Sequence, residues 1–260
     1  MSGDRPPILV TAERDAVLAR AVEALGPFPT AQPWVLIGGL AVFLRLGSIT
    51  RPTADADTVA RSQAELIQQL IADGVTSVVV SGDIQVPIGN STVEIDVMDL
   101  ADDPLPVDLE RRAFALARRC ALLTAETEQV IVTDPSYAVI ADATIPVATI
   151  AALTALKTVS MVRRPHGDHP HKVGSDIHDL VRLVAIGDLR TIACGLVAFD
   201  RELAGWVATQ IARAFGNDLR YTLLRLRAND RSPGARALTD DDISATIILS
   251  DVLYEEMGNG

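Results

Sequence analysis

The sequence predicts an α+β fold in which a mixed β-sheet with flanking helices is followed by a C-terminal helical bundle. Two observations indicate this. Short apolar or alternating segments, separated by turn residues, fill residues 1–147 and are typical of strands. From residue 148 onward the apolar residues recur only at helical spacing. Because strands followed by a run of helices are typical of α+β proteins, we predict one region over residues 1–147 and a second over residues 148–260.

The first element is predicted to be a helix over residues 11–25. Thr11 is suited to the N-cap position, and two acidic residues follow in the first turn, where the helix dipole favours them. The apolar residues 34–37 then predict a short buried strand. Since a helical pattern follows this strand, Gly38 and Gly39 are predicted to lie at a strand-to-helix turn.

The rest of the first region contains both strands and helices. A helix is expected after Ser62, because Ser62 and Glu65 form a capping box, and another is expected over residues 109–123. The remaining strands of this region are predicted at residues 53–59, 75–80, 84–87, 91–98, 129–132, 138–140 and 145–147. The helices of the second region are predicted at residues 148–162, 175–186, 200–215, 218–228 and 239–256.

Charge is unevenly distributed along the chain. The 260 residues include 23 Lys and Arg against 34 Asp and Glu, a net charge of −11. Residues 1–110 hold 6 basic and 16 acidic residues, or −10, which leaves 17 and 18, or −1, for residues 111–260. A uniformly basic surface for nucleic-acid binding is therefore excluded, whereas a local basic groove in the second half is compatible with these numbers.

Nothing in the sequence predicts a membrane or secreted protein. No apolar stretch reaches the ~18 residues that span a bilayer, and the first residues lack the basic-then-apolar pattern of a signal peptide. The two cysteines, Cys120 and Cys194, occur in apolar helical patterns without the spacing of metal ligands. We therefore expect a cytoplasmic, reduced protein with no membrane partner.

Two aspartates one residue apart are the first candidates for chemistry. Asp55 and Asp57 fall on a predicted strand, where residues i and i+2 project from the same face. Carboxylates this close repel one another unless a cation lies between them or water screens them at an exposed strand end. The turn at Gly38 and Gly39 favours the cation, because backbone N–H groups at a helix start suit the phosphates that such a cation would also bind.

A third aspartate, Asp96, lies in the middle of a later strand. The residues on either side of it are apolar, so Asp96 is expected on the opposite face, together with Glu94 and Met98. A buried carboxylate there needs a partner, which is either a metal ion shared with Asp55 and Asp57 or an arginine. A glycine turn and three such carboxylates can hold Mg²⁺ against a triphosphate, which points to nucleotidyl transfer.

This order of motifs resembles the nucleotidyltransferase superfamily, and most of all the AbiEii-type toxin family, which includes the mycobacterial nucleotidyltransferase toxins. The resemblance covers roughly residues 34–185. The glycine pair, Arg51 and Thr53-Ala54-Asp55-Ala56-Asp57 are similar to the first motif of the family, and Asp96 is similar to its strand-borne acid. The segment between the glycines and the aspartates is longer than in most of the superfamily.

Two later motifs extend the resemblance. Lys157 with Arg163 or Arg164 is similar to a motif in which a helix carries lysine and then arginine. Asp176-Ile177-His178-Asp179-Leu180 is similar to the fourth motif, Asp-x-x-Asp-Leu. Leu40, in contrast, stands where related enzymes often carry Ser or Thr.

The resemblance implies a role for each matched residue. Asp55, Asp57 and Asp96 would bind one or two Mg²⁺ or Mn²⁺ ions, with Asp96 alternatively helping to deprotonate the attacking hydroxyl. Lys157 would neutralise charge on the phosphates in the transition state. The residues expected to contact the nucleoside triphosphate are Gly38, Gly39, Arg51, Thr53, Lys157 and Lys172.

Lys157 is one of only two lysines among the 23 basic residues, and its predicted helix is largely apolar. In a sequence that otherwise uses arginine, a lysine on an apolar helix indicates that this position requires a compact ammonium group. We therefore favour a functional lysine over a lysine on the protein surface. Asp176 and Asp179 are three residues apart and share one helical face. They are either solvated or hold Lys157 in place, and the sequence does not decide between these alternatives.

Two further segments have alternative interpretations. His166, His169 and His171 lie in a Gly- and Pro-containing segment next to Lys172, which permits a zinc site but lacks the firm geometry that zinc requires. We therefore favour a loop that contacts the nucleotide or a polynucleotide. A second basic stretch is a solvated helix face in its simplest interpretation and comprises Arg220, Arg225, Arg227 and Arg231.

Together these features predict a metal-dependent nucleotidyltransferase whose helical region completes the active site and the acceptor-binding surface. The resemblance implies the toxin of a toxin–antitoxin pair, with a cognate antitoxin as partner and, as in related toxins, the 3′ end of tRNA as acceptor. A protein hydroxyl or a small molecule such as an antibiotic is the alternative acceptor. The rival interpretation is a nucleotide- or partner-binding module that has lost catalysis.

Overall fold

The computed structural model of the chain describes residues 6–13, 16–48, 56–76, 83–100, 104–164 and 172–258, together with the backbone of residues 78–80. Contacts among these residues divide them into two units. The first unit takes in the described residues up to 48, from 56 to 100 and from 121 to 149. The second takes in residues 104–120 and the described residues from 150 onward, so most of the helix around residue 115 groups with the C-terminal helices.

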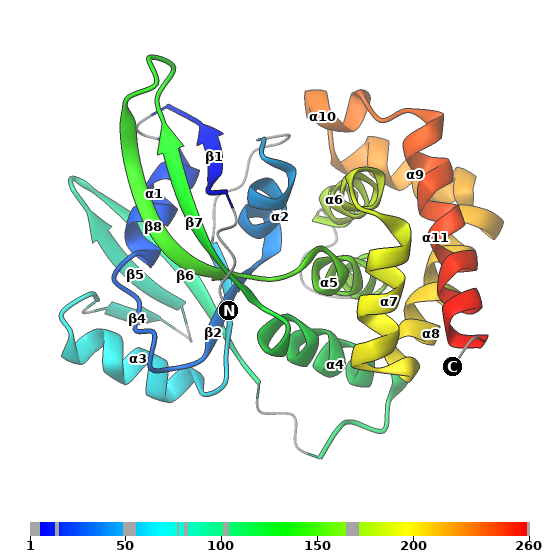
Figure 1. Cartoon of the computed structure of the whole chain (residues 1–260), viewed down its shortest axis with the longest axis horizontal. Coiled ribbons are helices and arrows are strands. Elements are labelled where there is room, and N and C mark those ends of the chain that lie inside the picture. Colours follow the sequence, from blue (N-terminus) through cyan, green and yellow to red (C-terminus); the bar gives the residue numbers. More distant parts are fainter. Residues whose placement is uncertain are drawn as a thin grey trace. The chain divides into compact units, whose positions relative to one another are not determined.

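The first unit is built on a mixed sheet of eight described strands (Figure 1). Their order is β1-β7-β8-β2-β3-β6-β5-β4. The pairs β1/β7, β8/β2 and β3/β6 are parallel, and the other pairs are antiparallel. The strands are β1 (Ile8–Thr11), β2 (Trp34–Ile37), β3 (Ala56–Ala60), β4 (Val78–Val80), β5 (Asp83–Ile88), β6 (Ser91–Asp99), β7 (Glu126–Thr133) and β8 (Val139–Val147).

Alternation of apolar and polar residues fixes which face of the central strands is buried. On β6 the side chains of Val93, Ile95 and Val97 are buried, and the residues between them are not. Ile84 on β5 and Ala56 on β3 stand opposite Ile95 in the ladder and are also fully buried. The other face of these strands is therefore the one that presents polar side chains.

The prediction of a helix from Thr11 is wrong at its N-terminal end. Residues Ile8–Thr11 form β1, which pairs in parallel with β7, and Thr11 stands opposite Thr133. Helix α1 (Val17–Leu25) begins six residues after Thr11 and packs against β8. Pairing with a strand more than a hundred residues away outweighed the local capping signal, because strand pairing depends on residues that are distant in sequence.

The two short strands predicted at 138–140 and 145–147 form one strand, β8. Ala141 and Ala143 lie between them and have weak strand propensity, but they alternate with exposed residues and pair with Val132 and Val130 of β7. The ladder with β7 therefore supplies what local propensity lacks.

Helix α2 (Gly38–Leu46) is fastened to the sheet by one arginine. Arg45 donates from Nε to the carbonyl oxygen of Ala148 at 2.9 Å and from a terminal nitrogen to that of Val147 at 2.9 Å. It also pairs with Glu128 at 2.7 Å and with Glu126 at 3.1 Å. These contacts hold the helix that follows the glycine turn against the ends of β7 and β8. The remaining helix of this unit, α3 (Gln63–Ala72), begins at the predicted cap Ser62, whose hydroxyl accepts from the Glu65 amide.

The second unit is helical. Its helices are α4 (Leu109–Leu123, with residues up to 120 in this unit), α5 (Ile150–Arg163), α6 (Val173–Ile186), α7 (Leu189–Phe199), α8 (Arg201–Ile211), the π-helix η3 (Ala212–Asn217), α9 (Leu219–Asn229), α10 (Pro233–Arg236) and α11 (Asp240–Gly258). Helix α5 packs against α6, α7 and α8, and α11 packs against α6, α7 and α8 (Figure 1). In the described part of the chain, no helix combines the length and apolar character that crossing a membrane requires.

Helix α7 is absent from the sequence prediction. Its buried residues Ile192, Ala193 and Leu196 share one face, but Gly195 lowers the helix propensity of its middle. A Cβ at Gly195 would lie 3.2 Å from the Cβ of Ala151, so this glycine lets α7 approach α5 closely. Asp188 caps the helix by accepting from the Thr191 amide. Tertiary packing and the cap therefore stabilise a helix whose middle has low propensity.

Candidate functional site

The strand-to-helix turn predicted at Gly38 is present and lies directly against an aspartate. Strand β2 ends at Ile37, and Gly38 begins α2 with a φ of +70°. A Cβ built on Gly38 would lie 1.8 Å from Oδ2 of Asp57. Both the left-handed backbone and this close approach exclude a larger residue, so the turn and the carboxylate form one packed unit.

Asp57 and Asp96 stand side by side on neighbouring strands. They are register partners in the parallel pair β3/β6, so their side chains project from the same face of the sheet. Both are half-buried, whereas Ile95 and Val97, which flank Asp96, are fully buried on the other face. The structure thus brings together two of the three predicted acids, on the face predicted for Asp96.

A further carboxylate continues this row. Asp83, at the start of β5, is the register partner of Asp96 on its other side. Asp83 lies just before the strand predicted at residues 84–87, and its pairing with Asp96 depends on the hairpin register rather than on any local motif. Among the described residues, however, no group of three or more histidines, cysteines, aspartates and glutamates gathers closely enough to hold one metal ion.

Three residues of the predicted first motif lie outside the described residues. They are Arg51, Thr53 and Asp55, which fall in the segment 49–55. Among the described residues, Asp57 and Asp96 fit part of a Mg²⁺ or Mn²⁺ site, because hard divalent cations prefer carboxylate oxygens.

The start of α2 is also suited to an anion. Its N-cap residue is Ile37, which makes no side-chain hydrogen bond to the first turn. Backbone N–H groups at such a helix start attract phosphate. Gly39 and Leu40 are both buried, and Leu40 at 1% exposure belongs to the apolar core. A phosphate at this turn would therefore be bound by backbone N–H groups. Leu40 has no hydroxyl to contribute, whereas the Ser or Thr that related enzymes often carry at this position would have one.

In the second unit, Lys157 forms a buried ion cluster with both predicted aspartates. Its side chain is 7% exposed, and Nζ lies 2.8 Å from Oδ2 of Asp179 and 3.2 Å from Oδ1 of Asp176. Asp179 is completely buried and Asp176 nearly so. The alternatives of a surface lysine and of a solvated aspartate pair are therefore wrong. Charges at this depth are stable only when paired, and here two carboxylates three residues apart on α6 pair with one ammonium from α5.

Arg164 completes this cluster. Its Nε lies 2.5 Å from Oδ2 of Asp176, while its neighbour Arg163 instead stacks on the ring of Phe114 at 4.5 Å. The structure thus assigns Arg164, and not Arg163, to the lysine-containing cluster. Two cations and two anions balance one another there, which lowers the cost of burying them.

The last predicted residues lie at the start of α6. Lys172 is the residue before this helix, and its carbonyl oxygen accepts from the Ser175 hydroxyl at 2.8 Å. His166, His169 and His171 fall in residues 165–171, outside the described residues. The fourth histidine, His178, is fully buried on α6, and its Nδ1 lies 3.2 Å from Oδ2 of Asp230. That contact is structural in character, because both side chains are enclosed.

Comparison with known proteins identifies the family. The family model described as nucleotidyl transferase AbiEii toxin, type IV TA system, matches residues 20–242. The chain belongs to this AbiEii nucleotidyltransferase toxin family. The match includes the glycine turn, the aspartate row and the Lys157 cluster, so every described site residue of this AbiEii-family chain lies within it. No curated protein is significantly similar to the chain.

Two solved structures are similar to this AbiEii-family chain. An antigenic nucleotidyltransferase-like protein from Paracoccidioides brasiliensis is 19% identical, with a TM-score of 0.45, over 80% of this chain and 89% of that one. A putative nucleotidyltransferase from H. pylori is 12% identical, with a TM-score of 0.44, over 93% of this chain and 94% of that one. The assignment to the AbiEii family rests on the family model.

Proposed function

We propose that the protein is a metal-dependent nucleotidyltransferase that transfers a nucleoside monophosphate from a nucleoside triphosphate to an RNA hydroxyl, such as the 3′ end of tRNA. The placement of Asp57 beside both Gly38 and Asp96 carries this proposal. It joins a phosphate-compatible helix start to two neighbouring carboxylates on one sheet face. Membership of a nucleotidyltransferase toxin family supports the same reaction.

The reaction assigns a task to each group. Bound Mg²⁺ or Mn²⁺ would neutralise the triphosphate and activate the α-phosphate. Asp55, Asp57 and Asp96 would hold the cation, and the amides of Gly38 and Gly39 would bind phosphate oxygens, with Arg51, Thr53 and Lys172 as further nucleotide contacts. The acceptor oxygen forms a bond to the α-phosphorus as the bond to the β-phosphate oxygen breaks. Pyrophosphate leaves, and the hydroxyl proton passes to a carboxylate such as Asp96.

Lys157 is proposed to neutralise the charge that develops on the phosphates. Asp176 and Asp179 would position its ammonium, since both contact Nζ. The antitoxin that a type IV system implies is proposed as the physiological partner.

The test is incorporation of labelled nucleotide. Each of the four nucleoside triphosphates is incubated with Mg²⁺ and total RNA, and separately with total protein or an aminoglycoside. We expect incorporation into RNA that EDTA abolishes, and that Asp57→Asn and Asp96→Asn lower by at least about a hundredfold. Glu94→Gln is the matched control, because Glu94 lies on the same strand and face as Asp96 but is exposed.

Two results would contradict the proposal. Nucleotide binding without incorporation into any acceptor would identify a non-catalytic binding module. Incorporation into protein or the small molecule, with RNA unlabelled, would show that the protein is a nucleotidyltransferase but that its acceptor is not RNA.

A further inference from the structure

Helices α9 and α10, with the turn between them, carry a concentration of arginines that the proposed chemistry does not use. Residues 219–238 contain five arginines and one acid, a net charge of +4 in a chain whose total is −11. The five residues, which we call the α9–α10 arginine surface, are Arg220, Arg225, Arg227, Arg231 and Arg236. Such a local reversal of sign favours an anionic partner.

These arginines are not neutralised within the described part of the chain. There, none of the five forms an ion pair, whereas Arg112, Arg164 and Arg190 each pair with an acid. All but Arg225 are exposed. The one acid of the segment, Asp230, is buried and directed to His178 and Ser232. The surface is therefore left with uncompensated positive charge.

Three of the arginines surround a cavity. Arg227, Arg231 and Arg236 line a space of about 570 Å³, together with Asp230 and with apolar residues such as Leu226 and Ile243. One arginine from the end of α9, one from the turn after it and one from α10 thus border the same space. Guanidinium groups bind phosphate through paired N–H donors, and the cavity is large enough for a phosphate and its sugar.

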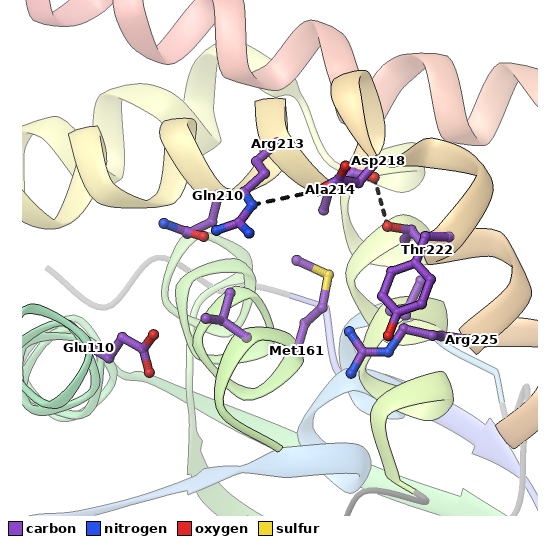
Figure 2. A pocket seen from close by; sticks show the side chains of 11 residues that line it. Glu110, Met161, Gln210, Arg213, Ala214, Asp218, Thr222 and Arg225 are labelled. Atoms are coloured by element: carbon purple, nitrogen blue, oxygen red, sulfur yellow. Dashed lines mark hydrogen bonds and ion pairs between the residues drawn. The ribbon is translucent and has the colours of Figure 1, made fainter. Parts of the chain in front are cut away.

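The first turn of α9 carries an exposed aromatic ring. Tyr221 is 60% exposed, and the Arg225 guanidinium lies 5.1 Å from its ring centroid. Both residues line a second cavity, of about 250 Å³, together with Arg213 (Figure 2). An exposed ring beside arginines is the arrangement on which an unpaired base can stack.

The π-helix η3 positions the residues of this second cavity through two contacts with the start of α9. The Thr222 hydroxyl donates to the Ala214 carbonyl at 2.7 Å, and Arg213 lies 3.5 Å from Asp218 (Figure 2). These contacts join the start of α9 to η3. π-helices are uncommon and are found frequently at functional sites.

We propose that the α9–α10 arginine surface binds a single-stranded segment of RNA, with phosphates on Arg227, Arg231 and Arg236 and a base on Tyr221. The inference rests on the proposed function, because it locates the surface that takes the RNA acceptor. A strand of RNA explains both the unpaired arginines and the exposed ring. An acidic protein segment would use the charges and leave Tyr221 without a role.

Binding of a fluorescent, unstructured RNA of about 12 nucleotides to the full chain tests the charge component. The triple variant R227Q/R231Q/R236Q should bind at least about tenfold more weakly near 0.1 M salt and should lower the slope of log K against log salt by about 2. Arg190→Gln is the control, since Arg190 is 76% exposed but paired with Glu256. Binding by the triple variant within twofold of the unaltered protein would overturn the proposal.

A second pair of variants tests the aromatic component. Tyr221→Ala should weaken RNA binding about 5- to 100-fold by loss of stacking, whereas Leu224→Ala, which changes an exposed apolar residue of the same helix, should not. A poly-glutamate peptide of equal length should compete poorly and should not respond to Tyr221→Ala. Tighter binding of that peptide than of the RNA would replace RNA by an acidic protein partner.

The same measurements separate this inference from the proposed function. RNA binding that depends on the arginines, without nucleotide incorporation, would support the RNA-binding surface and refute the proposed transferase activity. Incorporation into RNA that keeps its KM in the triple variant would retain the transferase and refute the surface. Matching circular dichroism and melting curves confirm that each variant is folded.

Discussion

At position 38 the backbone packs directly against the side chain of Asp57. Gly38 combines a φ of +70° with a side-chain position that Asp57 already occupies. The two constraints are separable, because Gly74 has the same φ of +70° but open space around it. Position 38 therefore determines the location of a carboxylate as well as the path of the chain.

Gly38→Ala should abolish nucleotide incorporation and destabilise the protein by more than Gly74→Ala. The left-handed backbone costs an alanine about 1 kcal/mol at either position, and only at position 38 must the Asp57 carboxylate also move. Urea unfolding and the incorporation assay measure the two effects. Equal destabilisation by both substitutions, with activity retained, would show that the contact with Asp57 has no consequence.

Lys157→Met should destabilise the protein by about 3–5 kcal/mol, because it leaves the carboxylates of Asp176 and Asp179 buried without the ammonium between them. Arg190→Met, which breaks an exposed pair with Glu256, should cost less than about 1 kcal/mol. Lys157→Arg keeps the charge but not the compact ammonium, so we expect a folded variant with lowered incorporation. A similar stability loss for Lys157→Met and Arg190→Met would contradict this account.

At the level of elements, α6 connects the Lys157 cluster to the arginine surface. Asp176 and Asp179 bind Lys157, while His178, between them in sequence, contacts Asp230 at the end of α9. Asp230 also accepts from the backbone amide of Ser232, the cap of α10. The polar residues of one helix therefore join α5, α9 and α10, although the helix is largely buried.

The Asp230 contact should appear in the acid stability of the protein. Burial raises the pKa of Asp230, but hydrogen bonds from His178 and from Ser232 outweigh it and bring the pKa from 3.8 to about 2. Because the folded pKa lies below the unfolded one, the stabilisation is complete above pH 3.8 and is lost as the pH falls toward 2. The shift corresponds to about 2 kcal/mol.

Comparison with Asp230→Asn measures this contribution. The difference in unfolding free energy between the unaltered protein and Asp230→Asn should decrease by about 2 kcal/mol or somewhat less between about pH 5 and about pH 2.5. A difference that stays constant with pH would show that Asp230 is not held ionised by these contacts.

At the level of the whole molecule, net charge differs along the chain. Residues 1–110 carry a net charge of −10 and residues 111–260 a net charge of −1, whereas residues 219–238 alone carry +4. An acidic protein is poorly suited to non-specific nucleic-acid binding, so a local basic surface would restrict RNA to one region.

Expression of the protein without its antitoxin should arrest growth, because the AbiEii family belongs to a toxin–antitoxin system. Asp57→Asn should relieve the arrest, and Glu94→Gln should not. Colony counts under an inducible promoter, with protein levels checked by immunoblot, provide the measurement. Arrest that persists with Asp57→Asn would dissociate toxicity from the proposed transfer reaction.

Several features of the site could be predicted from local sequence. The apolar run before Gly38 and the helical pattern after it indicate the turn, and the apolar neighbours of Asp96 indicate its face. These predictions succeed because alternation and helical spacing depend on residues that are near in sequence. For Asp176 and Asp179 the sequence left open solvation or a contact with Lys157, and the structure shows the contact.

The sequence by itself therefore determined the order of elements around the turn, the sheet face of Asp96 and the family. Only the tertiary structure decided that Asp57 lies against Gly38 and beside Asp96, that Asp83 continues the row, and that Lys157 is buried between two carboxylates. Strand register and helix packing join residues distant in the chain, and their energy comes from burying surfaces that no local pattern contains.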